Sequence, residues 1–254
     1  MRWSKRGLNM PLAVFCCALP LLPAAALERS QNATPQTIGS QQQPSAPPQP
    51  GKAEQKPRAE PFVLIDPGHG GDDKGAVFSG RLAEKDVTLS LGRELRKQLE
   101  ERGIPVKLLR ETDVNISLER RAELANEPRT AFYIGLHAGP PGKGVRVYAP
   151  LLPSTEPAAG RFWPWDGAQM ASLERSRKLA QAVAKELQKR NIRVRILASP
   201  LRPLNNIVPP AIAVELAPDP DNMHSLESEK TQSAVASAIA SAIAQRRATA
   251  GGRP

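Results

Sequence analysis

Four side chains that can bind metal or transfer protons lie far apart in the sequence: His69, Glu84, His137 and Glu215. Two imidazoles and one carboxylate are a typical ligand set of a catalytic zinc ion, which keeps one position open for water. Zinc lowers the pKa of that water to about 7, and a second carboxylate can take up the proton as hydroxide attacks a carbonyl. These residue types are therefore the minimum that a metal-assisted hydrolytic site needs.

Each of the four residues also has a purely structural interpretation, because the spacing is not an HExxH motif with both histidines on one helix face. His69 could form a hydrogen bond within its Gly-rich loop, and Glu84 could favour the positive end of a helix dipole. His137 could be a hydrogen-bonded buried histidine, and Glu215 could pair with an arginine. Residue chemistry alone leaves both interpretations open.

The elements that must position these side chains follow from the spacing of apolar residues. Short apolar runs typical of buried strands alternate with longer segments whose apolar residues recur at helical spacing. The predicted strands are 62–66, 106–110, 131–137, 144–149, 194–198 and 211–216, and the predicted helices are 85–102, 118–125, 173–190 and 225–244. This alternation predicts a single α/β domain with a mostly parallel or mixed twisted sheet of about six strands and helices on both faces. Sites in such sheets form outside the carboxyl ends of the strands, where His69, His137 and Glu215 are expected.

The sequence before residue 61 differs in composition from this predicted domain. Residues 1–26 have a basic start, an apolar run from Leu12 to Leu22 and an Ala-rich end, the pattern of a secretory signal peptide. The run is short for a membrane anchor and contains Pro20. Residues 27–60 are rich in Pro, Gln and Ser and predict a disordered tether. With a disordered tail expected at 246–254, the catalytic domain is predicted to span 61–245.

The charge and cysteine content narrow the classes of partner. The 254 residues include 35 Lys plus Arg and 25 Asp plus Glu, which gives a formal net charge of +10. Both cysteines, Cys16 and Cys17, lie in the predicted signal peptide, so the mature chain would have no disulfide and no Cys metal site. Export separates the chain from nucleic acid, and the basic excess instead fits an anionic envelope surface. We expect a monomer that contacts the membrane only transiently, through its signal peptide.

The motifs of the predicted domain resemble the zinc-dependent N-acetylmuramoyl-L-alanine amidases, in particular the type 3 catalytic domain of these cell-wall amidases. In chain order they are DPGHGGDDKGA (66–76), EKDVTL (84–89), LLRETD (108–113), LERRAELAN (118–126), IGLHAG (134–139), KGVRVY (143–148) and AIAVEL (211–216). The resemblance extends over about 62–244. It implies one Zn²⁺ ion held by His69, Glu84 and His137, with Glu215 as the catalytic glutamate.

The resemblance also implies a reaction and a place of action. Its substrate would be peptidoglycan, hydrolysed at the amide between N-acetylmuramic acid and L-alanine during cell-wall remodelling, daughter-cell separation or recycling. An exported protein is implied, periplasmic or else extracellular at the cell wall, with or without a protein activator. Two alternatives remain: a zinc peptidase that cuts the stem peptide, and a non-catalytic peptidoglycan-binding or regulatory module.

Three positions depart from the family pattern. Family members commonly carry Ser two residues before the second histidine and Asn two residues after it, whereas this sequence has Gly135 and Gly139. After the catalytic glutamate the family usually continues with Gly-Phe, and here Ala217-Pro218 follows. These departures affect substrate contacts, loop rigidity and the pocket wall.

A loop rich in aromatic residues follows the fourth predicted strand. Residues 151–170 contain Arg161, Trp163 and Trp165, which could form a substrate lip over the site. In that hypothesis the Trp faces stack on sugar or peptide, and Arg161 meets a carboxylate. The alternative is a loop whose aromatic side chains fold back on the domain.

Overall fold

The computed structural model describes residues 60–78, 82–152 and 165–251. The predicted signal peptide, nearly all of the tether, Arg161 and Trp163 lie outside the described residues. Within the described part of the chain, no helix combines the length and the apolar character needed to cross a bilayer.

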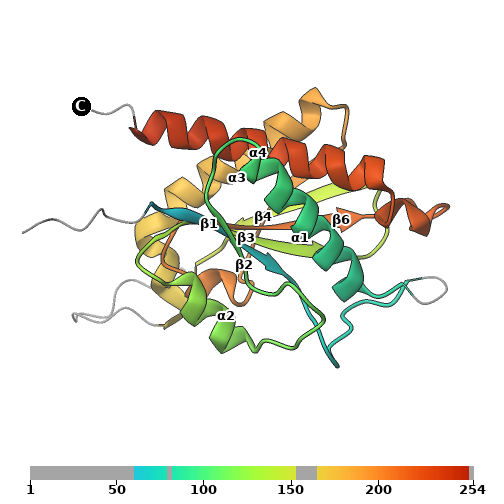
Figure 1. Ribbon diagram of the computed structural model, residues 1–254, viewed down its shortest axis with the longest axis horizontal. Coiled ribbons are helices and arrows are strands. Elements are labelled where there is room, and N and C mark those ends of the chain that lie inside the picture. Colours follow the sequence, from blue (N-terminus) through green and yellow to red (C-terminus); the bar gives the residue numbers. More distant parts are fainter. Residues whose placement is uncertain (1–59, 79–81, 153–164, 252–254) are drawn as a thin grey trace, which may run out of the picture. The chain divides into compact units, whose positions relative to one another are not determined.

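Six strands form one mixed sheet with the order β2-β1-β3-β6-β4-β5 (Figure 1). Neighbouring strands are parallel except for β4 and β6, which are antiparallel. The predicted α/β class and mostly parallel or mixed sheet are confirmed. The strands are β1 (Phe62–Pro67), β2 (Val106–Leu108), β3 (Thr130–Ala138), β4 (Gly144–Pro150), β5 (Val194–Ser199) and β6 (Ala211–Ala217).

Within the described residues, four α-helices and three short 3₁₀ helices lie between or after the strands. The first three α-helices agree with the prediction to within two residues at each end. The helices are α1 (Glu84–Glu100), α2 (Leu118–Ala125), α3 (Leu173–Lys189), α4 (Glu229–Gly251), η1 (Trp165–Ser172), η2 (Leu204–Asn206) and η3 (Met223–Leu226).

The last helix lies further along the chain than predicted. Met223–Leu226 is a 3₁₀ helix, and α4 begins only at Glu229. At the other end α4 continues to Gly251, so residues 246–251 of the predicted disordered tail are helical. The sequence from Gln245 to Ala248 consists of good helix formers, and the first helix-ending glycine comes only at 251.

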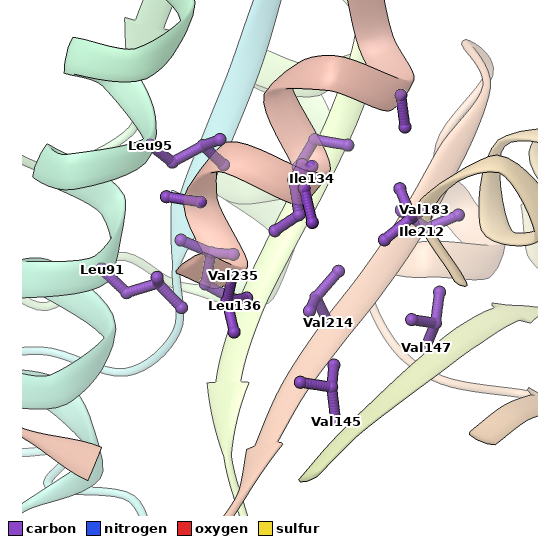
Figure 2. Packing of buried hydrophobic residues seen from close by; sticks show 14 of the residues in the cluster. Leu91, Leu95, Ile134, Leu136, Val145, Val147, Val183, Ile212, Val214 and Val235 are labelled. Atoms are coloured by element: carbon purple, nitrogen blue, oxygen red, sulfur yellow. The ribbon is translucent and has the colours of Figure 1, made fainter. Parts of the chain in front are cut away.

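The two faces of the sheet are covered unequally. Side chains alternate along each strand, so Val63 and Ile65 point to one face while Phe62 and Leu64 point to the other. The first face carries the larger core, formed with the long helices α1, α3 and α4. Figure 2 shows this core. Its labelled residues are Leu91 and Leu95 of α1, Val183 of α3, Val235 of α4, and strand residues Ile134, Leu136, Val145, Val147, Ile212 and Val214.

The second face carries a smaller core beneath short elements. Ala125 of α2 and Leu204 of η2 are buried there against Phe62, Leu64 and Tyr133. The expectation of helices on both faces is therefore confirmed. Because the covering on this face is short, the carboxyl ends of β1, β3 and β6 remain accessible beside it.

Candidate metal centre

The structure brings His69, Glu84 and His137 together although they are far apart in the sequence. One ligand atom from each residue can be chosen so that all lie within 4.8 Å of one another. His69 follows β1, Glu84 is the first residue of α1, and His137 is near the end of β3. The two imidazole rings are 5.6 Å apart between centroids and nearly perpendicular. The predicted gathering of these three residues at the carboxyl edge of the sheet is present.

Glu84 is the centre of this group. Its Oε2 lies 3.1 Å from His69 Nε2, and its Oε1 lies 3.0 Å from His137 Nδ1. The backbone N–H groups of Ala76 and Ala138 donate to the same two oxygens. Burial raises the pKa of Glu84, but the hydrogen bonds from His137, His69 and Ala76 outweigh burial and hold this pKa well below its usual range. Glu84 is therefore an ionised carboxylate that is only 5% exposed.

Asp73 orients the His69 ring. Its Oδ2 lies 2.9 Å from His69 Nδ1, which leaves Nε2 facing Glu84. The hydrogen bond with Glu84 raises the pKa of His69 against the opposing effect of burial, and Asp73 adds to the rise. A carboxylate on the outer nitrogen is a common way to fix the tautomer and orientation of a metal-binding histidine.

Arg121 of α2 fixes the backbone of the loop that carries His69. It is buried, donates to the carbonyl oxygens of His69 (2.7 Å) and Pro67 (3.0 Å), and pairs with the buried Asp66. His69 has a φ of +63°, a conformation that non-glycine residues rarely adopt. Arg121 therefore compensates a strained backbone at the point where the imidazole must be held.

Arg110 supports the same loop from the other side. It is 2% exposed and donates to the carbonyl oxygens of Pro67 and Gly68. This use of Arg110 also explains why β2 ends at Leu108 and not at 110 as predicted, since the chain turns to bring this guanidinium inward. Both arginines match family motifs, and both form internal contacts.

Glu215 lies on β6 directly opposite His137 of β3 and opposite Arg146 of β4. Arg146 Nη1 donates to Glu215 Oε1, and the Tyr148 hydroxyl lies 3.4 Å from the same oxygen. Arg146 also donates to the carbonyl oxygen of Pro140 at 3.1 Å. The alternative that Glu215 pairs with an arginine is thus confirmed, and the pairing is compatible with its position next to His137.

Two cavities open beside the centre. One of about 310 Å³ is lined by His137, Glu215 and aromatic or apolar residues, including Tyr133 and Tyr148. The other, of about 190 Å³, is lined by His69, His137 and polar residues of the α2 region. Both cavities reach His137, so a substrate that extends on both sides of the centre has room.

Sequence reasoning missed Asp73 and Arg146. Asp73 is four residues after His69 in the Gly-rich turn, and that proximity is a signal that could have found it. Arg146 becomes visible only through the β4–β6 register. Trp165, one of the three residues of the predicted substrate lip, is the first residue of η1. Arg161 and Trp163 are outside the described residues, so the lip stays a prediction.

Two histidines and a buried glutamate at the carboxyl edge of this sheet define an α/β domain with a candidate metal centre. A family model described as N-acetylmuramoyl-L-alanine amidase matches residues 63–245. The chain belongs to this family, the type 3 amidases, and the resemblance drawn from the motifs is confirmed.

Individual relatives agree with this assignment. The N-acetylmuramoyl-L-alanine amidase AmiC of Neisseria meningitidis is 33% identical over 172 residues, which are 57% of this chain and 41% of that protein. The chain thus matches less than half the length of this relative. The solved structure of amidase AmiC2 of Nostoc punctiforme is 28% identical with a TM-score of 0.59, over 75% of this chain and 98% of that one. The CwlD amidase of Clostridioides difficile, solved in complex with the GerS lipoprotein, is 21% identical with a TM-score of 0.58. The match covers 75% of this chain and 100% of that one, and it supports the assignment of the fold.

Proposed function

We propose that this protein is a zinc-dependent N-acetylmuramoyl-L-alanine amidase, which hydrolyses the amide between N-acetylmuramic acid and L-alanine in peptidoglycan. The observation that carries the proposal is the ionised Glu84 between two imidazoles, one of them beside Glu215 on the neighbouring strand. The names of the relatives supply the substrate class.

The three clustered residues fit one Zn²⁺ ion. His69 through Nε2, Glu84 and His137 would hold it, and two imidazoles with one carboxylate suit zinc. A bound zinc ion polarises a carbonyl oxygen and lowers the pKa of water to about 7.

Glu215 is proposed as the general base and acid. It accepts the proton of the attacking water and passes it to the amine nitrogen of the leaving L-alanine. Both described contacts of the carboxylate, from Arg146 and Tyr148, fall on Oε1. Oε2 is thereby available for the proton.

Incubation of purified sacculi with the mature protein tests the function. We expect released peptides that begin with L-alanine, no release with a chelator, and at least 100-fold slower release by Glu215→Gln at unchanged bound zinc. Exposed Glu119 is the site of the matched control, Glu119→Gln, which is expected to act like the wild type. Peptides that begin at a later residue would instead identify a stem peptidase. Binding of sacculi with no release would identify a non-catalytic module.

The place of action follows from the substrate. We propose an exported, periplasmic and monomeric protein, because cell-wall amidases act outside the cytoplasm. The solved complex of the CwlD amidase with the GerS lipoprotein is the reason to test this protein for a protein activator.

A further inference from the structure

Arg202 lies in the loop between β5 and η2, at a point common to both cavities beside the centre. It lines the 310 Å³ cavity together with His137 and Glu215, and the 190 Å³ cavity together with His69 and His137. A substrate placed with its reacting amide at this centre and extending into either cavity therefore passes next to Arg202.

No charged group in the described part of the chain pairs with the Arg202 guanidinium. Each carboxylate that lines the two cavities is held by another group: Asp66 by Arg121, Asp73 by His69, and Glu215 by Arg146. Arg202 itself is exposed, and it forms no ion pair or hydrogen bond with any residue in the described part of the chain. It is thus a cation available to an anionic group of a ligand.

The substrate of the proposed function, on which this inference rests, offers such a group near the reacting amide. The second residue of a peptidoglycan stem is D-glutamate joined through its γ-carboxyl, which leaves its α-carboxylate free one residue beyond L-alanine. A guanidinium binds a carboxylate through two parallel hydrogen bonds, a geometry that lysine and amides cannot reproduce. We propose that Arg202 is a specificity-determining residue that binds the free α-carboxylate of the second stem residue.

The lining of the larger cavity strengthens this contact. Tyr133, Tyr148, Leu201 and Leu204 give the cavity an aromatic and apolar wall. A carboxylate held against that wall is less screened by water than one on an open surface. Amidation of the carboxylate removes the charge and one acceptor oxygen, so an amidated ligand loses the contact while it keeps the rest of its structure.

Two muropeptides that differ only at this group test the proposal: N-acetylmuramyl-L-alanyl-D-glutamate, with a free α-carboxylate, and N-acetylmuramyl-L-alanyl-D-isoglutamine, in which it is amidated. Their dissociation constants are measured by calorimetry on the zinc-loaded Glu215→Gln protein, so that turnover does not interfere. We expect the free acid to bind about 10-fold more tightly than the amide. Adding Arg202→Gln should remove this preference, and Arg202→Lys should restore only part of it.

Arg177, an exposed residue of α3 on the opposite side of the sheet, provides the matched control. Arg177→Gln removes the same charge and should leave the preference intact. Equal affinity of the Glu215→Gln protein for both ligands, or an Arg202→Gln variant that retains the preference, would overturn the assignment. A failure of the proposed function would give a different result: the wild-type protein would bind the muropeptides but would not hydrolyse them.

Discussion

Glu215 occupies the space that a side chain at position 139 would need. A Cβ atom on Gly139 would lie 2.4 Å from the Glu215 carboxyl carbon and 2.5 Å from Oε2. The ion pair with Arg146 holds the carboxylate there from the other side. The glycine that replaces the family's usual Asn at residue 139 therefore leaves room for the carboxylate of the proposed general base.

Gly139→Ala should displace Glu215 and slow the reaction. Because the clash is with the reacting carboxylate, we expect kcat to fall at least 10-fold, with bound zinc and melting temperature close to the wild type. Gly135→Ala, in the preceding strand β3, is the control, since a Cβ there meets Tyr133 at 3.4 Å, an ordinary contact, and does not meet Glu215. If Gly139→Ala turned over sacculi at the wild-type rate, this dependence on the glycine would be wrong.

Asp73→Asn should weaken zinc binding by about 10- to 100-fold, because it removes the charge that orients and polarises the His69 ring. Competition with a chromogenic chelator measures the affinity. Asp72→Asn removes the same charge from the adjacent exposed residue and should leave the affinity within twofold. Equal zinc affinities of the Asp73→Asn and Asp72→Asn proteins would show that Asp73 does not support His69 as a zinc ligand.

Arg121→Lys should lower the free energy of unfolding by about 2 kcal/mol, because lysine cannot reach Asp66 and two carbonyl oxygens at once. Urea denaturation measures this change. Arg120 is the neighbouring control: it pairs with Glu123 at the surface, so Arg120→Lys should change the free energy by less than about 0.5 kcal/mol. A wild-type urea midpoint for Arg121→Lys would contradict the assigned role.

Glu186 of α3 should make stability depend on pH. The hydrogen bonds from Lys189 and Arg190 lower its pKa from 4.5 to about 2. A carboxylate whose pKa is lower in the folded state stabilises the fold above the unfolded pKa, and this contribution disappears as the pH falls from 4.5 towards 2. Glu186→Gln should therefore cost about 1 to 2 kcal/mol at pH 7 and progressively less below pH 4.5.

The pair Glu174 and Lys178 on the same helix is the control, since both side chains are more than half exposed. Glu174→Gln should change the free energy of unfolding by less than about 0.5 kcal/mol at any of these pH values. A constant difference between the wild type and Glu186→Gln from pH 7 to pH 2 would refute the linkage.

Local patterns in the sequence were enough to predict most of the fold. The apolar run at 62–66 and the Leu91, Leu95 and Leu99 stripe identify β1 and the buried face of α1, because the periods of strand and helix differ. His69, Glu84 and His137 could be grouped in advance, since parallel strands bring their carboxyl ends to one edge.

What the sequence could not predict depends on contacts between distant segments. The pairing of Arg146 with Glu215 requires the antiparallel register of β4 and β6, and no local pattern encodes that register. The close approach of Gly139 to Glu215 depends in the same way on a long-range register, that of the parallel strands β3 and β6. The end of β2 depends on Arg110 turning towards the β1 loop, a tertiary contact that overrides the strand propensity of the preceding residues.

The sheet and the proposed active site are complete only when β6 is present. β6 is the last strand to be synthesised, yet it lies between β3 and β4 and joins β2-β1-β3 to β4-β5. Until residues 211–217 are present, the two halves each expose an unpaired inner edge, and the chain lacks Glu215. Chains that end before β6 are thus both incompletely paired and without the proposed general base, and their exposed strand edges make them open to proteolysis.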